Sequence, residues 1–404
     1  MNENDSEKMA GLLESKGLVP AKDETCADVI LINTCCVRDN SERKAKGFIH
    51  IAGNIKKQRP GVLIAVTGCM AKRLEDSLLT KYKFVDFVLG PDREMELDGI
   101  VSSVPSPPAP SPIGRGAFIK RKPSVRAWVK VMEGCNNFCS FCIVPYVRGR
   151  EKSRPIEDIV KEIEALDKNI YKEVMLLGQN VNSYEYGFAD LLKRVSGIDG
   201  LLRVRFMSSH PKDMTPQIID AVAANKKICE AFHLPLQSGD NEILKKMNRG
   251  YTREDFVRLV KDIRSRVQGA GITSDVIAGF PGETEEQFLN TLDLIDELEL
   301  DSVITASYDP RPGTTAEKMD GQLSADVKKE RLARLVAMVK KTAFKINKRL
   351  EGSVVEILVE EKGFGRTRPY KIVRFDGPSP KAGELARVKI KRANSWVLNG
   401  ELIT

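Results

Sequence analysis

The chain contains a short stretch with three closely spaced cysteines, Gly134-Cys135-Asn136-Asn137-Phe138-Cys139-Ser140-Phe141-Cys142. A closed structural zinc site needs four ligands, and an ordinary four-iron cluster is held by four thiolates. Three thiolates on a four-iron cluster leave one iron open to another ligand. The C-x3-C-x2-C spacing therefore favours a reactive metal centre over the two alternatives, a zinc site or three incidental buried thiols.

The residues around this stretch predict the fold that holds it. Residues 127–135 begin as an apolar strand, which places the cysteines in the loop at its C-terminal end. Five further strand patterns alternate with helical patterns, at residues 173–180, 201–209, 231–238, 272–280 and 301–310. Six β/α units between residues 117 and 340 predict a partial (β/α)6 TIM-type barrel, whose active face is the C-terminal end of its strands.

Polar side chains stand at the C-terminal ends of several predicted strands, where a hydrophobic core would not require them. They are Gln179, Asn180, Gln237, Ser238 and Asp275. Amides, hydroxyls and carboxylates form directional hydrogen bonds, so we expect them to line the site of a small polar cofactor, with loop capping as the alternative for each. Two histidines near strands, His210 and His233, are expected to be scaffold, and Cys229 a buried hydrophobic residue.

The N-terminal region, residues 1–102, predicts a small parallel α/β domain. Strand patterns at residues 29–35 and 62–69 flank a helical pattern at residues 41–58. Both strands end in a cysteine, Cys35 and Cys69, and open α/β sheets bind ligands at that edge. The two thiols indicate either a second metal site or small buried residues at strand ends.

A proline-rich stretch, residues 103–116, is expected to be an extended linker, with a proline-rich protein ligand as the alternative. Residues 341–404 show four short alternating strand patterns that predict a small antiparallel β-barrel. From Thr342 to Thr404 there are 13 Lys and Arg against 7 Asp and Glu. A surplus of this size could equally belong to an ordinary solvated surface. The stretch from Gly363 to Arg368 is expected to be a turn that places cations beside an aromatic residue, which favours RNA binding over a purely structural cap. The expected contacts are Arg366, Arg368, Lys371 and Arg374.

The whole chain has a net charge of +8 and no apolar run long enough to span a membrane. Its first residues are acidic and polar, unlike a secretory signal. Eight cysteines that cluster at strand ends, without the spacing of a disulfide framework, predict a reducing cytoplasmic location.

The three-cysteine loop resembles that of the radical S-adenosylmethionine (SAM) enzymes, in which the open iron chelates SAM. The likeness extends over the whole chain to the tRNA branch of the radical SAM methylthiotransferases, and the C-terminal region resembles the RNA-binding TRAM domain. The motifs that agree with this branch are Asn33-Thr34-Cys35, Gly68-Cys69-Met70-Ala71, Gly134–Gly149, Leu234–Gly239, Met247–Arg253 and Tyr308–Thr314.

The resemblance implies an enzyme that converts N6-isopentenyladenosine beside the tRNA anticodon to its 2-methylthio derivative. It implies SAM and two four-iron clusters. One, on Cys135, Cys139 and Cys142, would reduce SAM to give a 5′-deoxyadenosyl radical, and the auxiliary one, on Cys35, Cys69 and a third cysteine, would supply sulfur. The implied partners are tRNA and an electron donor such as flavodoxin or ferredoxin, and we expect a monomer.

The auxiliary site departs from the family pattern. The family's first auxiliary cysteine lies in a Gly-Cys-Gln-Met-Asn stretch, whereas the first residues of this chain match the family's residues C-terminal to that cysteine. The resemblance therefore predicts a truncated gene model or a late start codon. Cys26 and Cys36 are the possible substitutes, with Cys36 disfavoured because adjacent strand residues point to opposite faces.

Three alternatives to this function remain open. Members of the same family methylthiolate N6-threonylcarbamoyladenosine in tRNA or an aspartate of a ribosomal protein. A protein of another class, a non-catalytic RNA-binding iron–sulfur protein, would bind tRNA and yield no 5′-deoxyadenosine from SAM.

Overall fold

The computed structural model of the protein describes residues 1–37, 39–91, 93, 96–97, 99, 121, 123–377 and 380–403. The predicted linker, residues 103–116, lies outside these ranges, as does Arg38. The chain divides into two compact units. The first comprises Met1–Lys122, Gly134–Asn136 and Cys142–Glu151, and the second comprises Pro123–Glu133, Asn137–Phe141 and Lys152–Thr404.

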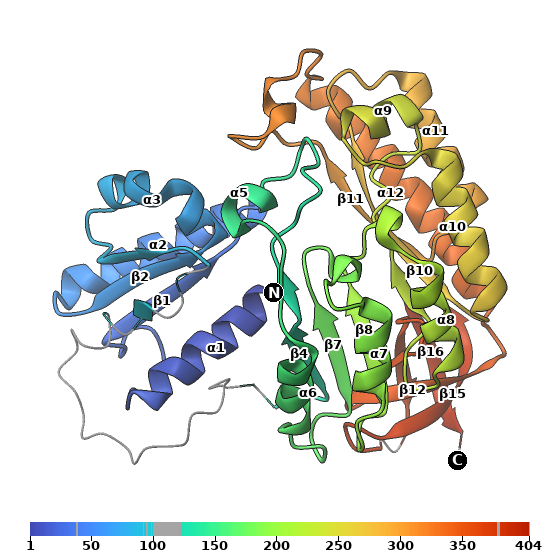
Figure 1. Ribbon diagram of the computed structural model, residues 1–404, viewed down its shortest axis with the longest axis horizontal. Coiled ribbons are helices and arrows are strands. Elements are labelled where there is room, and N and C mark those ends of the chain that lie inside the picture. The colour runs from blue at the N-terminus through green and yellow to red at the C-terminus, as the bar shows by residue number, and fades with distance from the viewer. Residues whose placement is uncertain are drawn as a thin grey trace. The chain divides into compact units, whose positions relative to one another are not determined.

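The first unit is the predicted parallel α/β domain (Figure 1). Its sheet has the order β1-β2-β3, and side chains alternate between its two faces. Leu31, Leu63 and Ala65 face Met9 of helix α1, whereas Ile30, Ile64 and Val66 pack with helices α2 and α3. The elements are α1 Asn2–Ser15, β1 Val29–Thr34, α2 Asp39–Gln58, β2 Leu63–Gly68, α3 Cys69–Lys81 and β3 Phe87–Leu89.

The second unit contains the predicted barrel of six β/α units. One parallel sheet has the order β4-β7-β8 and another the order β9-β10-β11. A parallel bridge between Val204, in β8, and Ile228, just before β9, connects the two sheets. The strands are β4 Arg126–Lys130, β7 Glu173–Leu177, β8 Arg203–Met207, β9 Ala231–His233, β10 Gly271–Ala278 and β11 Ser302–Ser307.

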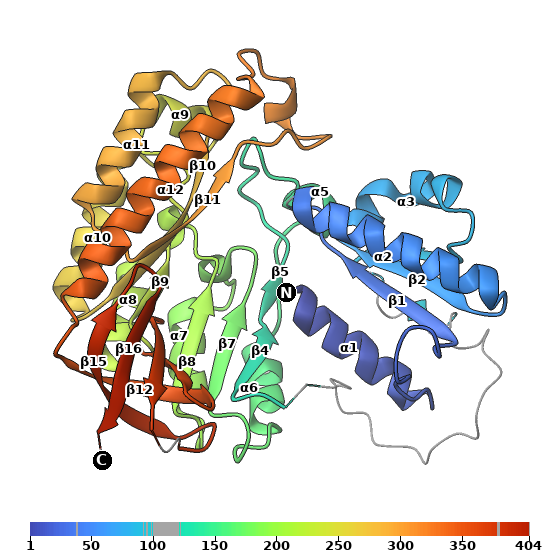
Figure 2. The same cartoon turned by 180° about the vertical axis from the view of Figure 1, so that it is seen from behind.

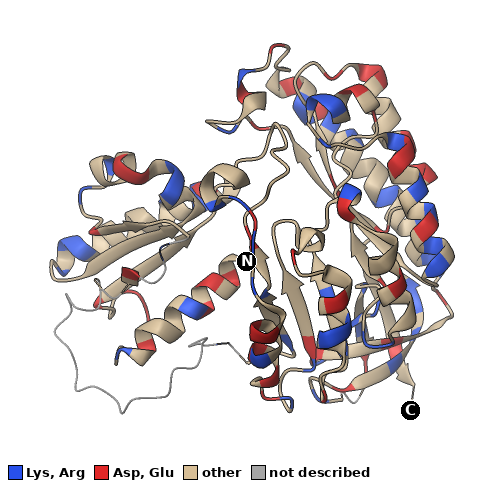
Figure 3. Cartoon of the chain, viewed as in Figure 1, with Lys and Arg blue, Asp and Glu red and all other residues tan. Residues whose placement is uncertain are grey.

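Helices cover the outside of this barrel (Figure 2). Two of them begin at a capping box, Thr252 with Asp255 and Thr284 with Gln287, which satisfies backbone N–H groups that the helix itself leaves free. Along these helices basic and acidic residues are interspersed (Figure 3). The helices are α6 Ile156–Glu164, α7 Phe188–Ser196, α8 Pro216–Ala224, α9 Asn241–Lys246, α10 Arg253–Arg266, α11 Glu285–Glu297 and α12 Ala325–Lys348.

The predicted strands extended too far at their C-terminal ends. Strand β7 stops at Leu177 and β9 at His233, because the polar residues after them belong to the loops above the barrel. The first predicted strand is divided into β4 and β5 Met132–Glu133, and β5 pairs with β6 Lys152–Ser153 on the far side of the cysteine loop.

The C-terminal strands close into a five-stranded barrel of the order β12-β13-β14-β16-β15. The sequence prediction missed β13, which was assigned to a turn. It also expected only antiparallel pairing, whereas β14 and β16 are parallel. The pairs β12-β13, β13-β14, β12-β15 and β15-β16 are all antiparallel, so β14 and β16 run in the same direction and have to pair in parallel. The strands are β12 Val354–Glu361, β13 Phe364–Thr367, β14 Ile372–Asp376, β15 Leu385–Ala393 and β16 Val397–Ile403.

Buried ion pairs join this small barrel to the N-terminal ends of the large barrel's strands. The carboxylate of Glu173, which opens β7, pairs with both Arg126 and Arg205. Arg126 also donates to Glu360 Oε1 at 2.7 Å, and Arg203 donates to the carbonyl oxygen of Arg366 at 2.7 Å. The predicted domain boundary at residue 340 falls inside α12, which ends at Lys348. Among the described residues no helix is long and apolar enough to cross a membrane.

Candidate active site

The central cysteine of the loop, Cys139, accepts a hydrogen bond from a buried arginine. Cys139 is 8% exposed, and Arg249 Nη1 donates to its Sγ at 3.2 Å. The same guanidinium donates to Pro235 O at 2.8 Å and to the hydroxyl of Tyr251 at 3.1 Å. The arginine therefore places a charged hydrogen-bond donor on the sulfur of Cys139.

The segment that contains Arg249 also fixes the backbone around Cys139. Ser140 N donates to Met247 O at 3.0 Å, and its Oγ donates to Lys246 O at 2.8 Å. Asn248 Nδ2 donates to Phe138 O at 3.1 Å. The Met247–Arg253 motif, which the sequence analysis used only as a family likeness, therefore holds residues 138–140 in place.

Three of the predicted cofactor-contacting residues have buried oxygens without a hydrogen-bond partner. They are Oε1 of Gln179, Oε1 of Gln237 and Oδ1 of Asp275. Gln237 has a φ of +71°, an uncommon backbone conformation for a residue other than glycine. The other carboxylate oxygen of Asp275 lies 3.4 Å from Nε2 of His233. These oxygens are free to accept hydrogen bonds from a ligand, because buried polar groups are normally paired.

The other two predicted contacts, Asn180 and Ser238, are engaged in loop structure. Asn180 Oδ1 accepts from His210 N at 3.2 Å, and its Nδ2 donates to Asp213 Oδ2 at 2.7 Å. Ser238 is fully buried and its Oγ accepts from Asp240 N at 3.3 Å. For these two residues the geometry favours the alternative of loop capping.

Cys229, expected to be a buried hydrophobic residue, and His210, expected to be scaffold, are both buried. Cys229 is 1% exposed. His210 accepts a hydrogen bond from Lys212 N at Nδ1, and its Nε2 has no partner. Burial, with Arg249 and Lys212 nearby, lowers the pKa of His210 to about 2, so this imidazole is neutral at physiological pH.

In the first unit, Cys35 and Cys69 lie at the same edge of the sheet, as expected. Cys35 directly follows β1 and Cys69 is the first residue of α3, after the register pair Thr34 and Gly68. Arg148 Nε donates to Cys69 Sγ at 3.2 Å, and Arg148 Nη2 donates to Asp5 Oδ2 at 2.9 Å. Arg148 comes from the motif after Cys142, and sequence analysis gave it no role.

The reason for disfavouring Cys36 was wrong. It assumed that Cys35 and Cys36 continue the strand, but β1 ends at Thr34, so the alternation of strand side chains does not apply to them. The thiol of Cys36 is fully buried and hydrogen-bonds to Cys69. That hydrogen bond, with the positive charge of Arg148, lowers the pKa of Cys69 against the opposing effect of burial. Cys26, the other possible substitute, is exposed.

Glycine precedes two of the candidate ligands for a geometric reason. Gly68 has a φ of +93°, and a Cβ there would lie 2.3 Å from Thr34 O. Gly134 has a φ of +78°, and a Cβ would lie 2.0 Å from Arg150 O. Only glycine adopts these positions without strain, so both Gly-Cys pairs are required by the backbone that presents Cys69 and Cys135.

Three of the four predicted RNA contacts are used inside the protein. Arg368 donates to both carboxylate oxygens of Glu230, Lys371 pairs with Asp301, and Arg366 pairs with Glu360. The Arg366 pair lies within the small barrel, and the other two contacts connect the small barrel to the large barrel. The structure therefore does not favour RNA binding by these three cations. Arg374 is exposed.

Arg374 belongs to an exposed basic face on three neighbouring strands of the small barrel. It is in register with Asn399 of β16, which is in register with Arg392 of β15. Strand β15 alternates buried and exposed residues. Its exposed side, together with Arg374, defines the basic face, which consists of Arg374, Arg387, Lys389, Lys391 and Arg392. Of these, Lys391 is paired with Glu401 at 2.7 Å.

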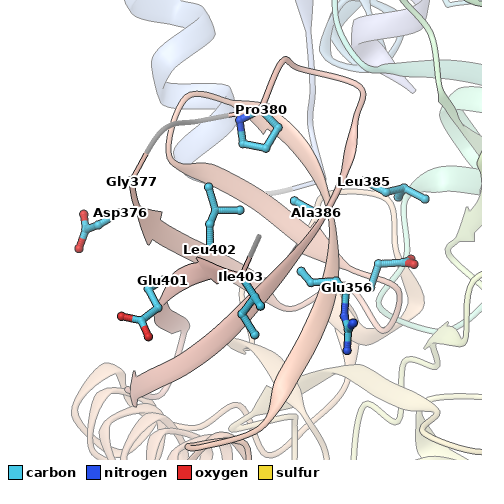
Figure 4. A pocket seen from close by; sticks show the side chains of 10 residues that line it. Glu356, Asp376, Gly377, Pro380, Leu385, Ala386, Glu401, Leu402 and Ile403 are labelled. Carbon is cyan, nitrogen blue, oxygen red and sulfur yellow. The ribbon is translucent and has the colours of Figure 1, made fainter.

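A pocket of about 590 Å³ borders the basic face of the small barrel, and Arg387 belongs to both (Figure 4). Its lining includes the carboxylates of Glu356, Asp376 and Glu401 and one guanidinium, that of Arg387. Three carboxylates repel phosphate, so this pocket is a poor site for RNA.

The donor chemistry at the two cysteine sites fits iron–sulfur clusters. Within the described part of the chain, no three His, Cys, Asp or Glu side chains converge closely enough to hold a metal ion. The observations that favour clusters are the arginine N–H groups on the sulfurs of Cys69 and Cys139. In the same unit as Cys139, the unpaired oxygens of Gln237 and Asp275 offer acceptors to a polar cofactor.

Family models match three parts of the sequence. Residues 1–90 match "Uncharacterized protein family UPF0004", residues 129–295 match the radical SAM superfamily, and residues 348–403 match the TRAM domain. Among solved structures, the chain is similar to the radical SAM methyltransferase TsrM from Kitasatospora setae, with a TM-score of 0.60, 16% identity, and coverage of 77% of this chain and 73% of that chain. This likeness supports the barrel fold.

Curated relatives match over the full length. The tRNA-2-methylthio-N(6)-dimethylallyladenosine synthase of Clostridium botulinum (strain Loch Maree / Type A3) is 46% identical over 426 aligned positions, which cover 100% of this chain and 95% of the relative. The synthase of the same name from Desulforamulus reducens is 44% identical, with coverage of 100% and 93%. The chain therefore belongs to the family of the tRNA-2-methylthio-N(6)-dimethylallyladenosine synthases, which are radical SAM enzymes.

Proposed function

We propose that the protein uses SAM to place a methylthio group on C2 of N6-dimethylallyladenosine in tRNA. The observation that supports this most is the relation of the chain, along its full length, to enzymes of that name. The hydrogen bond from Arg249 to the sulfur of Cys139, within the unit that contains the six-stranded barrel, agrees with it. The same relatives argue against threonylcarbamoyladenosine, a ribosomal protein or a purely RNA-binding role.

The ligands proposed for the first four-iron cluster are Cys135, Cys139 and Cys142. When bound, this cluster and SAM supply the radical that attacks an unreactive C–H bond. The chain holds the thiolates in place, and Arg249 keeps a donor on the sulfur of Cys139. A primary carbon radical abstracts hydrogen atoms from almost any nearby group. The protein must therefore exclude water and all C–H groups other than that of the substrate from this loop.

The residues proposed to bind SAM are Gln179, Gln237 and Asp275. Each has a buried oxygen without a partner among the described residues. Gln179 and Gln237 lie in the loops after β7 and β9, and Asp275 lies within β10. A carboxylate and two amide oxygens can accept hydrogen bonds from ribose hydroxyls and from ammonium and adenine amino groups. Asn180 and Ser238 would support these loops.

The second cluster, the proposed sulfur source, is assigned to Cys35 and Cys69. Arg148 donates a hydrogen bond to the sulfur of Cys69, as Arg249 does to that of Cys139. Cys36 is the described thiol in contact with Cys69, and it is the neighbour that we propose as a third ligand.

The basic face is proposed to bind the tRNA backbone, with Arg374 as the one originally predicted contact that remains exposed. A one-electron donor such as flavodoxin or ferredoxin is proposed to reduce the cluster. We propose a monomer that acts in the cytoplasm, where tRNA is modified. The proposed domains are residues 1–102, the large barrel and the small C-terminal barrel.

Nucleoside analysis tests this function. The reconstituted full chain is incubated anaerobically with SAM, a reductant and tRNA that contains N6-dimethylallyladenosine, and the digested tRNA is analysed by mass spectrometry. We expect the 2-methylthio derivative together with 5′-deoxyadenosine, and neither product from Cys139→Ala. Abundant 5′-deoxyadenosine without modified tRNA would mean that the cluster on Cys139 works but the sulfur site does not. Absence of both from the unmodified chain would reject the proposal.

A further inference from the structure

A buried arginine beside the cysteine loop has an uncompensated positive charge. Arg249 is 5% exposed, and its partners are the Cys139 sulfur, the Tyr251 hydroxyl and a backbone carbonyl. No carboxylate among the residues that the structure describes pairs with it. Guanidinium stays protonated in proteins, so a full positive charge points at this sulfur from a site largely shielded from water.

The comparable contact in the first unit is electrically different. Arg148 also donates to a cysteine sulfur, that of Cys69, but the same guanidinium is bonded to the carboxylate of Asp5. Asp5 and Arg148 are both almost fully buried, with side-chain exposures of 3% and 4%. The charge at Cys69 is thus largely cancelled, whereas the charge at Cys139 is not.

We propose that Arg249 sets the reduction potential of the iron–sulfur cluster that Cys139 helps to hold. This inference rests on the proposed assignment of Cys139 as a ligand. Reduction adds one electron from the external donor and no proton, so the negative charge on the cluster and its thiolates grows by one. An N–H donor and a positive charge on a ligand sulfur stabilise the reduced state more than the oxidised state, and they raise the potential.

Arg249 is therefore a positioning residue that acts through Cys139. Without the charge of Arg249 the cluster would be harder to reduce. An electron donor of fixed potential would then reduce a smaller fraction of the clusters, and SAM cleavage requires the reduced cluster. Its neighbour Asn248 offers a matched control. Asn248 holds the backbone at Phe138 and does not contact the sulfur. Since Asn248 has a φ of +56°, glycine replaces it without backbone strain.

The test is a redox titration of the full chain. Cys35→Ser and Cys69→Ser are introduced first, so that only the cluster on the three-cysteine loop contributes. Mediators and dithionite set the solution potential, and electron paramagnetic resonance measures the reduced cluster. The variants compared are Arg249→Met, Arg249→Lys and Asn248→Gly.

For Arg249→Met we expect the ratio of reduced to oxidised cluster at a fixed potential to fall about tenfold, which is about 59 mV for one electron. Arg249→Lys keeps the charge and should lose less, and Asn248→Gly should stay within about twofold of the parent. An unchanged ratio in Arg249→Met would overturn the proposal, as would an equal fall in Asn248→Gly.

Two further outcomes are distinguishable. If Arg249→Met does not retain iron, Arg249→Lys and Arg249→Gln are titrated instead, and an unchanged potential in Arg249→Gln overturns the proposal. If adding Cys139→Ala to the parent removes no iron, the assignment of the cluster to this loop has failed, and with it the proposed function. A shifted potential with normal iron content separates the role of Arg249 from that failure.

Discussion

The two ends of the large barrel bury polar groups for different purposes. At the N-terminal ends of the strands, Glu173 is 1% exposed and both of its oxygens pair with arginines. Toward the C-terminal ends, two buried oxygens have no hydrogen-bond partner among the described residues, that of Gln237 in the loop after β9 and that of Asp275 within β10. We name these the lower end and the upper end. The lower end satisfies its own charges and joins two domains, whereas the upper end leaves acceptors unsatisfied and available to a ligand.

The largest expected effect is the loss of Glu173 at the lower end. Glu173→Ala leaves Arg126 and Arg205 buried without their carboxylate, and we expect a loss of about 3–5 kcal/mol of unfolding free energy. Urea titration followed by tryptophan fluorescence measures it, because both tryptophans of the chain, Trp128 and Trp396, lie in the second unit. The exposed Glu164→Ala is the control. A loss below about 1 kcal/mol in Glu173→Ala would mean that the lower end does not hold the domains together.

The next effect is on the pH dependence of the unfolding free energy, which should differ between the two ends. His210, at the upper end, stays neutral when folded because its pKa is lowered, whereas in the unfolded chain it takes a proton below about pH 6.5. The stability it contributes is present above pH 6.5 and is lost as pH falls, at about 1.4 kcal/mol per pH unit. His210→Asn keeps an acceptor for Lys212 N and should remove this slope between pH 6 and pH 4.5.

The lower end should respond only in stronger acid. Paired arginines keep the pKa of the buried Glu173 below the ordinary glutamate value in spite of burial, which opposes them. Its contribution is therefore present above about pH 4.3 and is lost below that as the carboxylate is protonated. If His210→Asn retains the full slope from pH 6 to pH 4.5, the buried neutral imidazole is not its source.

A smaller effect should distinguish binding from stability at the upper end. Asp275→Asn removes the charge and keeps the shape, so we expect the dissociation constant for SAM to rise about tenfold, equivalent to about 1.4 kcal/mol. The unfolding free energy should change by less than about 1 kcal/mol, because the pair that Asp275 forms within the described residues, with His233, is a long one at 3.4 Å. Equilibrium dialysis with SAM and the same urea titration measure the two quantities. A large loss of stability with unchanged SAM binding would contradict the contrast between the ends.

The smallest effect concerns RNA. Arg374→Ala should weaken tRNA binding and reduce the slope of log affinity against log salt by about 0.9, as expected for one phosphate contact, without destabilising the fold. Arg368→Ala, at the lower end, should instead destabilise the protein and leave the salt slope unchanged, because Arg368 is bonded to Glu230. Filter binding at several salt concentrations decides between the two patterns.

Periodicity in the sequence predicted the architecture because strands and helices alternate with clear apolar patterns. The six barrel strands and the meeting of Cys35 and Cys69 at one sheet edge follow from it. The strand β13 was missed because Gly363 and two arginines are typical of a turn. Its pairing with β12 and β14 depends on residues distant in the sequence.

The predictions for single side chains were less complete, for a physical reason. Arg148 and Arg249 contact cysteines that lie 79 and 110 positions away, and nothing in their local sequence indicates this. Cations near a glycine turn, such as Arg366 and Arg368, resemble solvent-exposed RNA contacts. Their partners Glu360 and Glu230 become neighbours only in the folded chain.

The most direct test is the iron content of the chain, measured together with SAM cleavage. Iron, labile sulfide and 5′-deoxyadenosine are determined after anaerobic reconstitution of the parent and of Cys135→Ala/Cys139→Ala/Cys142→Ala. We predict that the variant contains about four fewer irons per chain and forms no 5′-deoxyadenosine. A variant that keeps its iron and still cleaves SAM would contradict the assignment of the reactive centre to the upper end of the barrel.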